Sequence, residues 1–119
     1  MALDLRTQLY REPDDAAWIE IWGITEDLLA MFRGEVASRN ARFILATLST
    51  DIQVHPDRSI RETFQRQVGT DSLFHADQRL REVAARQGIE IITLEPAMQR
   101  IAEETGAFLH GFGNDAFGH

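Results

Sequence analysis

The chain contains no cysteine and no lysine. Without thiols, the sequence excludes disulfides, zinc ribbons, iron–sulfur clusters and cysteine nucleophiles. All 12 basic residues are arginine, and 19 acidic residues outnumber them, so the formal net charge is −7. Nucleic acid phosphates and anionic membrane surfaces both require a basic partner surface. We therefore expect a protein that binds neither nucleic acid nor membranes.

Long apolar runs, Gly-rich phosphate loops and low-complexity tracts are also absent. No stretch approaches the roughly 20 apolar residues that cross a bilayer, and the first residues lack the apolar segment of a signal peptide. We therefore expect a cytoplasmic protein. The four histidines show no i, i+4 pair and have no cysteine to assist them, so we expect no bound metal and no cofactor.

The 119 residues, 44% hydrophobic and 26% charged, suit one small globular domain over residues 1–119. Residues 1–12 carry a short alternation of leucines that is compatible with a strand, a loop or a frayed end. Residues 111–119 are rich in glycine and predict a loop. Both terminal segments are candidates for flexible ends.

A long amphipathic helix is predicted after Pro13-Asp14-Asp15, because apolar residues recur there at spacings of three and four. Asp14 or Asp15 can cap its first turn, and Asn40 can end it in the left-handed conformation. We expect one apolar stripe that packs in the core, the two tryptophans included. The stripe consists of Trp18, Ile21, Trp22, Thr25, Leu28, Leu29, Phe32 and Val36.

Two short apolar runs, residues 43–48 and 89–94, predict strands. The first is almost continuously apolar, which is typical of a strand covered on both faces of a parallel sheet. Residues 107–110 are a candidate for a last short strand. Strands that alternate with helices indicate an α/β fold, with a short parallel sheet flanked by helices.

Three shorter helices are predicted between and after these strands. Residues 59–62 have the spacing of a capping box before a helix that ends at Gly69. A second helix covers residues 77–87 and stops at Gly88, and a third begins at Glu95-Pro96 and ends at Gly106.

In open α/β sheets, functional sites lie beyond the carboxyl ends of the strands. Here those positions are Ser49-Thr50-Asp51, Leu94-Glu95-Pro96 and the segment that follows residues 107–110. That segment contains Asp115 and His119, which are close enough in sequence to meet as a carboxylate–imidazole pair, the usual general-base arrangement. A disordered polar tail is the alternative interpretation.

An ordered series of short stretches between Trp18 and His119 resembles the C-terminal half of SGNH (GDSL-type) hydrolases, in a bacterial branch of these esterase-like enzymes. The resemblance implies a flavodoxin-like three-layer sandwich, in which a serine attacks an ester carbonyl and a histidine takes its proton. The stretches are Trp18-x-x-x-Trp22-x-x-Thr25-x-x-Leu28-Leu29, Phe43-Ile44 with Thr47-Leu48, Gln53-Val54-His55-Pro56-Asp57, Asp71-x-Leu73-Phe74, Asp77-x-Arg79-Leu80, Gly88-Ile89, Leu94-x-Pro96-x-Met98, and Leu109-His110-Gly111-Phe112 leading to Gly118-His119.

The same resemblance assigns the catalytic histidine to His119, because the closing Gly118-His119 is similar to the start of the family's histidine motif. The family's acid commonly lies three residues earlier, where this chain has Ala116, so Asp115 is the candidate acid one residue further away. Residues 1–17 contain no Gly-Asp-Ser nucleophile block. We therefore expect a hydrolase fragment, truncated before and after, that is inactive alone on the small esters of the full-length family.

Two other functions stay open. A half sheet leaves an unpaired edge and an uncovered helix face, which predicts an interaction module that forms a homodimer or a higher oligomer. A small molecule binding at the strand ends near Asp51, His55 and His110 is the other possibility. Against it, His55 can simply cap its loop beside Pro56, and His110 can be a packed residue beside Phe112.

Overall fold

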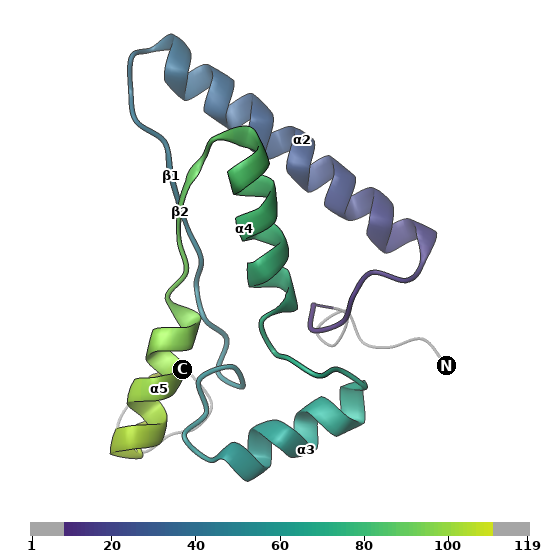
Figure 1. Cartoon of the computed structure of the whole chain (residues 1–119), viewed down its shortest axis with the longest axis vertical. Helices are drawn as coiled ribbons and strands as arrows, with labels where there is room; N and C mark the ends of the chain where they lie inside the picture. The colour runs from purple at the N-terminus through teal and green to yellow at the C-terminus, as the bar shows by residue number, and fades with distance from the viewer. Residues whose placement is uncertain (1–8, 111–119) are drawn as a thin grey trace.

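The computed structural model describes residues 9–110. Within these residues the chain is a mixed α/β protein with four helices and a two-stranded parallel sheet, in the order α2–β1–α3–α4–β2–α5 (Figure 1). The predicted alternation of helices and strands is confirmed. The predictions for residues 1–8 and 111–119 lie outside the described residues.

Helix α2, Ala16–Ser38, begins and ends next to the capping residues that the sequence predicted. The Asp15 carboxylate accepts a hydrogen bond of 2.9 Å from the backbone N–H of Trp18, so Asp15 is the cap. After the helix, Asn40 adopts φ of 55°, the left-handed conformation that ends many helices. Both signals in the sequence are confirmed.

Helices α3, Arg58–Val68, α4, His75–Gln87, and α5, Glu95–Thr105, each end on a glycine with positive φ, as predicted. The predicted capping box over residues 59–62 is wrong. Asp57 caps α3 instead, because its Oδ1 accepts hydrogen bonds from both the backbone N–H and the hydroxyl of Ser59. The Ser59 hydroxyl donates to Asp57, so the Asp57 carboxylate and not the Ser59 hydroxyl caps the helix.

Strands β1, Ile44–Ala46, and β2, Glu90–Ile92, pair in parallel with Ile44 opposite Glu90 and Ala46 opposite Ile92. Both are shorter than predicted. Residues 107–110 are not a strand: no ladder forms there, and the chain turns after α5 with the Ala107 N–H donating to the Thr105 hydroxyl.

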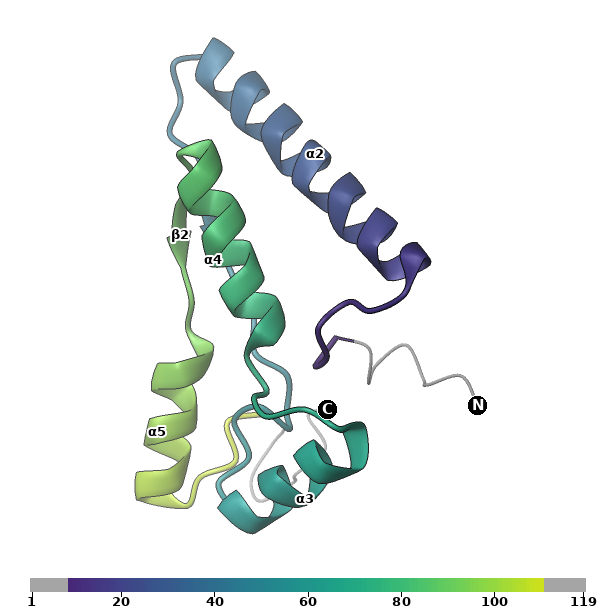
Figure 2. The ribbon, with the colours of Figure 1, turned by 45° about the vertical axis from the view of Figure 1, so that its right-hand side comes forward.

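Only one face of this small sheet is well covered. Leu45 and Ile91 are half-buried, and Figures 1 and 2 show α4 lying between the strands and α2. On the opposite face, Ile44 and Ile92 remain 45% and 50% exposed. The expectation that the first strand is covered on both faces is therefore wrong for the described residues, because α2 and α4 lie to the same side of the strands.

One cluster of buried apolar side chains joins the segment before α2 to α3 and the loop that follows it, and Val83 and Ala84 are buried on α4. Tyr10 packs edge-on against Phe64 at 5.3 Å between ring centroids, next to Val68 and Leu73. Helix α2 contributes no buried residue. Its predicted single stripe divides in two: one part is half-buried, and another part is exposed, although Phe32 of that part stacks on Phe43. The half-buried part consists of Trp18, Trp22, Thr25, Leu29 and Val36, and the exposed part includes Ile21, Leu28 and Phe32.

The side of α2 that faces α4 is held by a few specific contacts. The Arg79 guanidinium lies over the Trp22 ring at 5.1 Å from its centroid, and the Gln87 amide donates to the backbone carbonyl of Glu26. Among the helices of residues 9–110, none is both long and apolar enough to cross a lipid bilayer.

Candidate functional site

Parallel pairing brings the two segments that follow β1 and β2 to the same end of the sheet. We call this end the carboxyl edge; it consists of residues 47–57 and 93–95 together with Asp77 and His110, whose side chains reach it. The Thr47 N–H donates to the Ile92 carbonyl at 3.0 Å and extends the pairing by one residue. The ends of the two strands, where the sequence predicted functional side chains, therefore lie next to each other, and polar groups follow both strands there.

Two buried carboxyl groups meet at this edge. Glu95 opens α5 and is fully buried, and its Oε2 accepts a 2.7 Å hydrogen bond from the Thr47 hydroxyl. Asp77 lies in the first turn of α4 and is 8% exposed. Both groups thus sit near helix N-termini, which favour negative charge. The two helix starts converge here because α5 follows the end of β2 directly and α4 begins beside the same strand ends.

The proximity of these carboxyls changes how Asp77 titrates. Burial, the negative charge of Glu95 and a hydrogen bond shared with that carboxyl together raise the pKa of Asp77 to about 7. Oε1 of Glu95 is buried and has no hydrogen-bond donor. We interpret Asp77 as the member of this pair that holds a proton up to about neutral pH, an arrangement suited to acid–base chemistry.

Gln53 ties this pair to the rest of the carboxyl edge. Its buried amide oxygen accepts from the Thr50 N–H at 2.9 Å, and its NH₂ group donates to the Leu73 carbonyl at 2.9 Å. The same NH₂ group lies 3.4 Å from Oδ2 of Asp77. One side chain therefore fixes the loop after β1 against the loop before α4.

A serine and a histidine also meet here. Ser49 Oγ, three residues beyond β1, lies 2.7 Å from Nε2 of His110, and both side chains are half-buried. A hydroxyl at hydrogen-bond distance from an imidazole is the geometry of a nucleophile and its base. The sequence pointed to Ser49 and His110 separately and gave no reason to pair them. The one feature that could have paired them is that both lie at or just beyond the ends of predicted strands, and such ends meet at one edge of a parallel sheet.

The cavity that borders His110 is small. A cavity of about 10 Å³ lies between Asp51, His55, Phe108 and His110, which is room for about one water molecule. The structure thus brings together the three residues considered for small-molecule binding, without room for a substrate between them. His55 caps its own loop, as its alternative interpretation predicted, because its Nδ1 accepts from the Asp57 N–H at 3.0 Å.

A wider groove of about 590 Å³ opens beside Asp77. Phe74 and Ala85 of the α4 region and Pro96 at the start of α5 form part of its apolar lining, and Arg81 supplies a positive charge. Asp77 is the member of the carboxyl pair that reaches this groove. A ligand in it would meet an acid whose pKa is near 7.

A third polar cluster holds the N-terminal segment to the loop before α4. His75 lies between two carboxylates, with its Nε2 at 2.7 Å from Asp71 Oδ1 and its Nδ1 at 3.2 Å from Glu12 Oε1. The hydrogen bond from His75 lowers the pKa of Asp71. Asp71 is almost fully exposed, so this cluster joins two surface segments.

The predicted catalytic residues His119 and Asp115 lie outside the described residues. The described chain reaches the carboxyl edge at His110, nine residues before His119. Within residues 9–110, no three side chains of His, Asp or Glu are grouped in a way that could hold a metal ion.

These observations define the class of the protein as mixed α/β with polar groups collected at the carboxyl ends of parallel strands. Comparisons with known proteins add no relative: no family model matches the chain, and no curated protein or solved structure is significantly similar to it. The resemblance to SGNH hydrolases therefore stays a prediction.

Proposed function

We propose that residues 18–119 are the half of an SGNH-type ester hydrolase that carries the general base, built on a flavodoxin-like three-layer sandwich. The observation that supports this most directly is the parallel, in-register pairing of β1 with β2, with hydroxyl, imidazole and carboxyl groups gathered at its carboxyl edge. Active sites of open α/β sheets lie at this edge. In this proposal His119 takes the proton and Asp115 orients its imidazole.

The same proposal holds that this polypeptide does not hydrolyse esters by itself. It contains no Gly-Asp-Ser block. Ser49 is the one hydroxyl that meets an imidazole among the described residues, but the cavity that borders this imidazole, His110, is only about 10 Å³. A carbonyl carbon needs an approach of about 3–3.5 Å in a defined direction, and that cavity has no room for an ester.

Short-chain aryl esters test this directly. We expect the 119-residue chain to show no turnover that depends on a serine, so the rates of wild type and Ser49→Ala should be equal. A rate that Ser49→Ala abolishes would show that this chain already holds its own nucleophile and would overturn the proposal.

The encoded sequence on either side of the chain gives the second test. We expect a Gly-Asp-Ser block before residue 1 and Trp-Asn after His119. In a polypeptide that includes both, His119→Ala should lower kcat by about 10²–10⁴-fold, the usual contribution of a positioned base. Flanking sequence without either motif would contradict the assignment.

A second candidate function is self-association as an interaction module. One observation favours it: apolar side chains on α2 and on one face of the sheet are about half exposed or more, such as Met31 at 69% and Ile92 at 50%. Exposed apolar surface of this extent marks an interaction site.

A further inference from the structure

Helix α2 has apolar side chains on two sides, of which only one contacts the rest of the described chain. The outer side carries Ile21, Ile24, Leu28 and Met31, which we call the α2 seam. These four side chains are 47%, 51%, 49% and 69% exposed. A helix whose apolar residues extend beyond the row that packs on its own chain normally contacts a second surface there, and none of the described residues covers the α2 seam.

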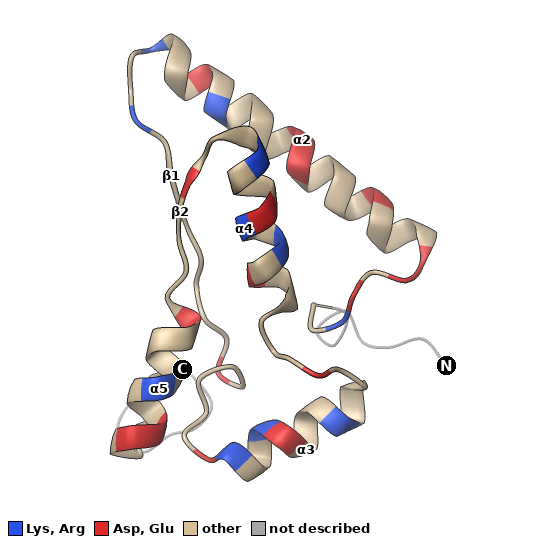
Figure 3. Cartoon of the chain, viewed as in Figure 1, with Lys and Arg blue, Asp and Glu red and all other residues tan. Residues whose placement is uncertain are grey.

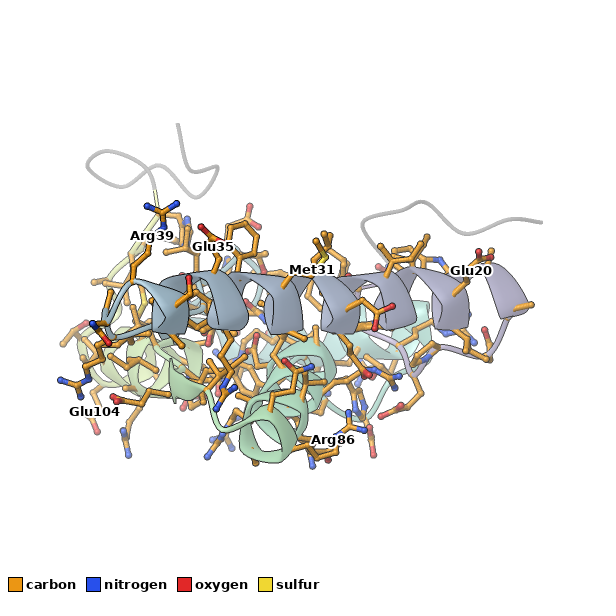
Figure 4. The ribbon with its side chains drawn as sticks, turned by 90° about the horizontal axis from the view of Figure 1, so that it is seen from above. Glu20, Met31, Glu35, Arg39, Arg86 and Glu104 are labelled. Carbon is orange, nitrogen blue, oxygen red and sulfur yellow. The ribbon has the colours of Figure 1, made fainter. Side chains whose placement is uncertain are left out.

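The spacing of the α2 seam identifies the kind of surface that fits it. Its members are separated by three, four and three residues, the pattern by which two helices pack along their length as a coiled coil. Figure 4 shows Met31 pointing away from the body of the molecule, on the same side of α2 as Glu20, Glu35 and Arg39. Another helix can therefore reach the α2 seam without displacing α4.

Charge along α2 favours one orientation of that second helix. Residues 14–27 carry five acidic residues and no arginine, whereas residues 28–42 carry three arginines and one glutamate (Figure 3). Arg39 pairs with Glu35 and Arg42 with Glu90 within the chain, but both arginines stay more than 70% exposed. Two copies of α2 in antiparallel orientation place the acidic end of each against the basic end of the other. Parallel copies would instead bring like charges together.

We propose that α2 joins two copies of this chain, with the α2 seams packed against each other in antiparallel orientation. In this arrangement Ile21 of one copy packs near Met31 of the other, and Ile24 packs near Leu28. The centre of the α2 seam lies within about one turn of the centre of α2, so the two helices overlap along most of their roughly 34 Å length. A two-fold axis relates the copies, as in most dimers of identical chains. The proposal does not depend on hydrolase ancestry.

Sedimentation equilibrium over a hundredfold range of protein concentration provides the first test. We expect the mass to rise with concentration from the monomer value of 13.5 kDa toward twice that value. Leu28→Glu should raise the Kd of the dimer by about 100-fold or more, because it places a charge at the centre of an apolar contact.

The matched control is Ile101→Glu. Ile101 lies in α5 and is 49% exposed, the same fraction as Leu28, but it is outside the α2 seam. This variant should dimerise like wild type, and circular dichroism should show unchanged helix content for both variants. A monomer at every concentration would overturn the proposal and indicate that another polypeptide covers the α2 seam. A dimer that Leu28→Glu leaves intact would overturn it in favour of another surface, such as the edges of the sheet.

The absence of cysteine allows a clean test of orientation. Under mild oxidation, a mixture of the Ile21→Cys and Met31→Cys variants should give cross-linked dimers in much higher yield than either variant alone. Parallel helices would give the reverse, with each variant cross-linking to itself. Ile101→Cys should cross-link to neither. Ester hydrolysis does not enter any of these measurements, so their failure is distinguishable from failure of the proposed hydrolase function.

Discussion

At the carboxyl edge the buried side chains are mainly polar, whereas α2 leaves many of its apolar side chains exposed. Thr47, Gln53, Asp77 and Glu95 are at most 8% exposed, and each has a hydrogen-bond partner from a different segment. In α2 no residue is buried. Most buried polar groups of the carboxyl edge thus find partners within this chain, whereas α2 still has apolar surface to bury.

The two regions also differ in how deeply their long-range contacts are buried. At the carboxyl edge Gln53 bonds to Leu73 and Thr47 bonds to Glu95, and all four residues are buried. Glu26 of α2 bonds to Arg86 and Gln87 at exposed or half-buried positions. Buried polar networks of this kind fix one arrangement of the backbone, because every alternative leaves a polar group without a partner. Removing a partner from the carboxyl edge should therefore affect stability more than any substitution on the outer side of α2.

The largest effect is expected for Gln53→Ala. This substitution leaves the Thr50 N–H and the Leu73 carbonyl without their partners and opens a cavity, so we expect the free energy of unfolding to fall by about 3 kcal/mol. Urea denaturation measures the change. Gln67→Ala, an exposed substitution in α3, is the control and should change the free energy by less than about 0.5 kcal/mol. Equal effects of the two variants would show that the buried amide does not hold the loops together.

A smaller effect is expected from the two sides of α2. Trp22→Ala removes a half-buried ring and its contact with Arg79, and should lower the free energy of unfolding by about 2 kcal/mol. Ile24→Ala on the outer side should change it by less than about 0.5 kcal/mol. Both are to be measured in a Leu28→Glu background, so that self-association makes no contribution. A large loss from Ile24→Ala in that background would mean that the outer side packs within the monomer.

The smallest of the three effects concerns pH. The folded chain holds the Asp77 proton with a pKa of about 7, above the value of about 3.9 in an unfolded chain. The stabilisation from this group is therefore complete below pH 4 and is lost as the pH rises toward and through 7. Between pH 5 and 8 we expect wild type to lose more than about 1 kcal/mol of unfolding free energy relative to Asp77→Asn. The histidines contribute equally to both proteins and cancel in the difference.

Asp27→Asn, an exposed carboxylate of α2, serves as the control for this pH experiment. Its pH dependence should follow that of wild type. If Asp77→Asn also follows wild type from pH 5 to 8, then Asp77 does not hold a proton near neutral pH.

Local signals in the sequence predicted the helices well. Asp15, Asn40 and three glycines mark where helices begin or end, because capping and left-handed conformations depend on a few neighbouring atoms. The prediction of a capping box over residues 59–62 failed because Asp57, two residues earlier, caps the helix instead. Its carboxylate accepts hydrogen bonds from both the N–H and the hydroxyl of Ser59. The strands were predicted too long, since hydrophobicity continues past the point where backbone pairing stops.

The sequence predicted where the candidate site lies but not which side chains meet there. Parallel strands directed attention to Ser49, Glu95 and the segment around His110, and the structure brings polar groups together there. The partnership of Asp77 with Glu95 had no signal, because the two residues come from different helices and lie eighteen positions apart. The roles of His119 and Asp115 stay predictions.

The sequence by itself determined the order of the helices and strands, the ends of the helices and the absence of thiol chemistry, because these depend on residue types and short-range geometry. Tertiary structure decided which apolar side of α2 meets α4, which carboxyl holds a proton and which serine meets a histidine. These outcomes depend on distances between segments far apart in the chain, and burial and charge acquire their energies only when the fold sets those distances.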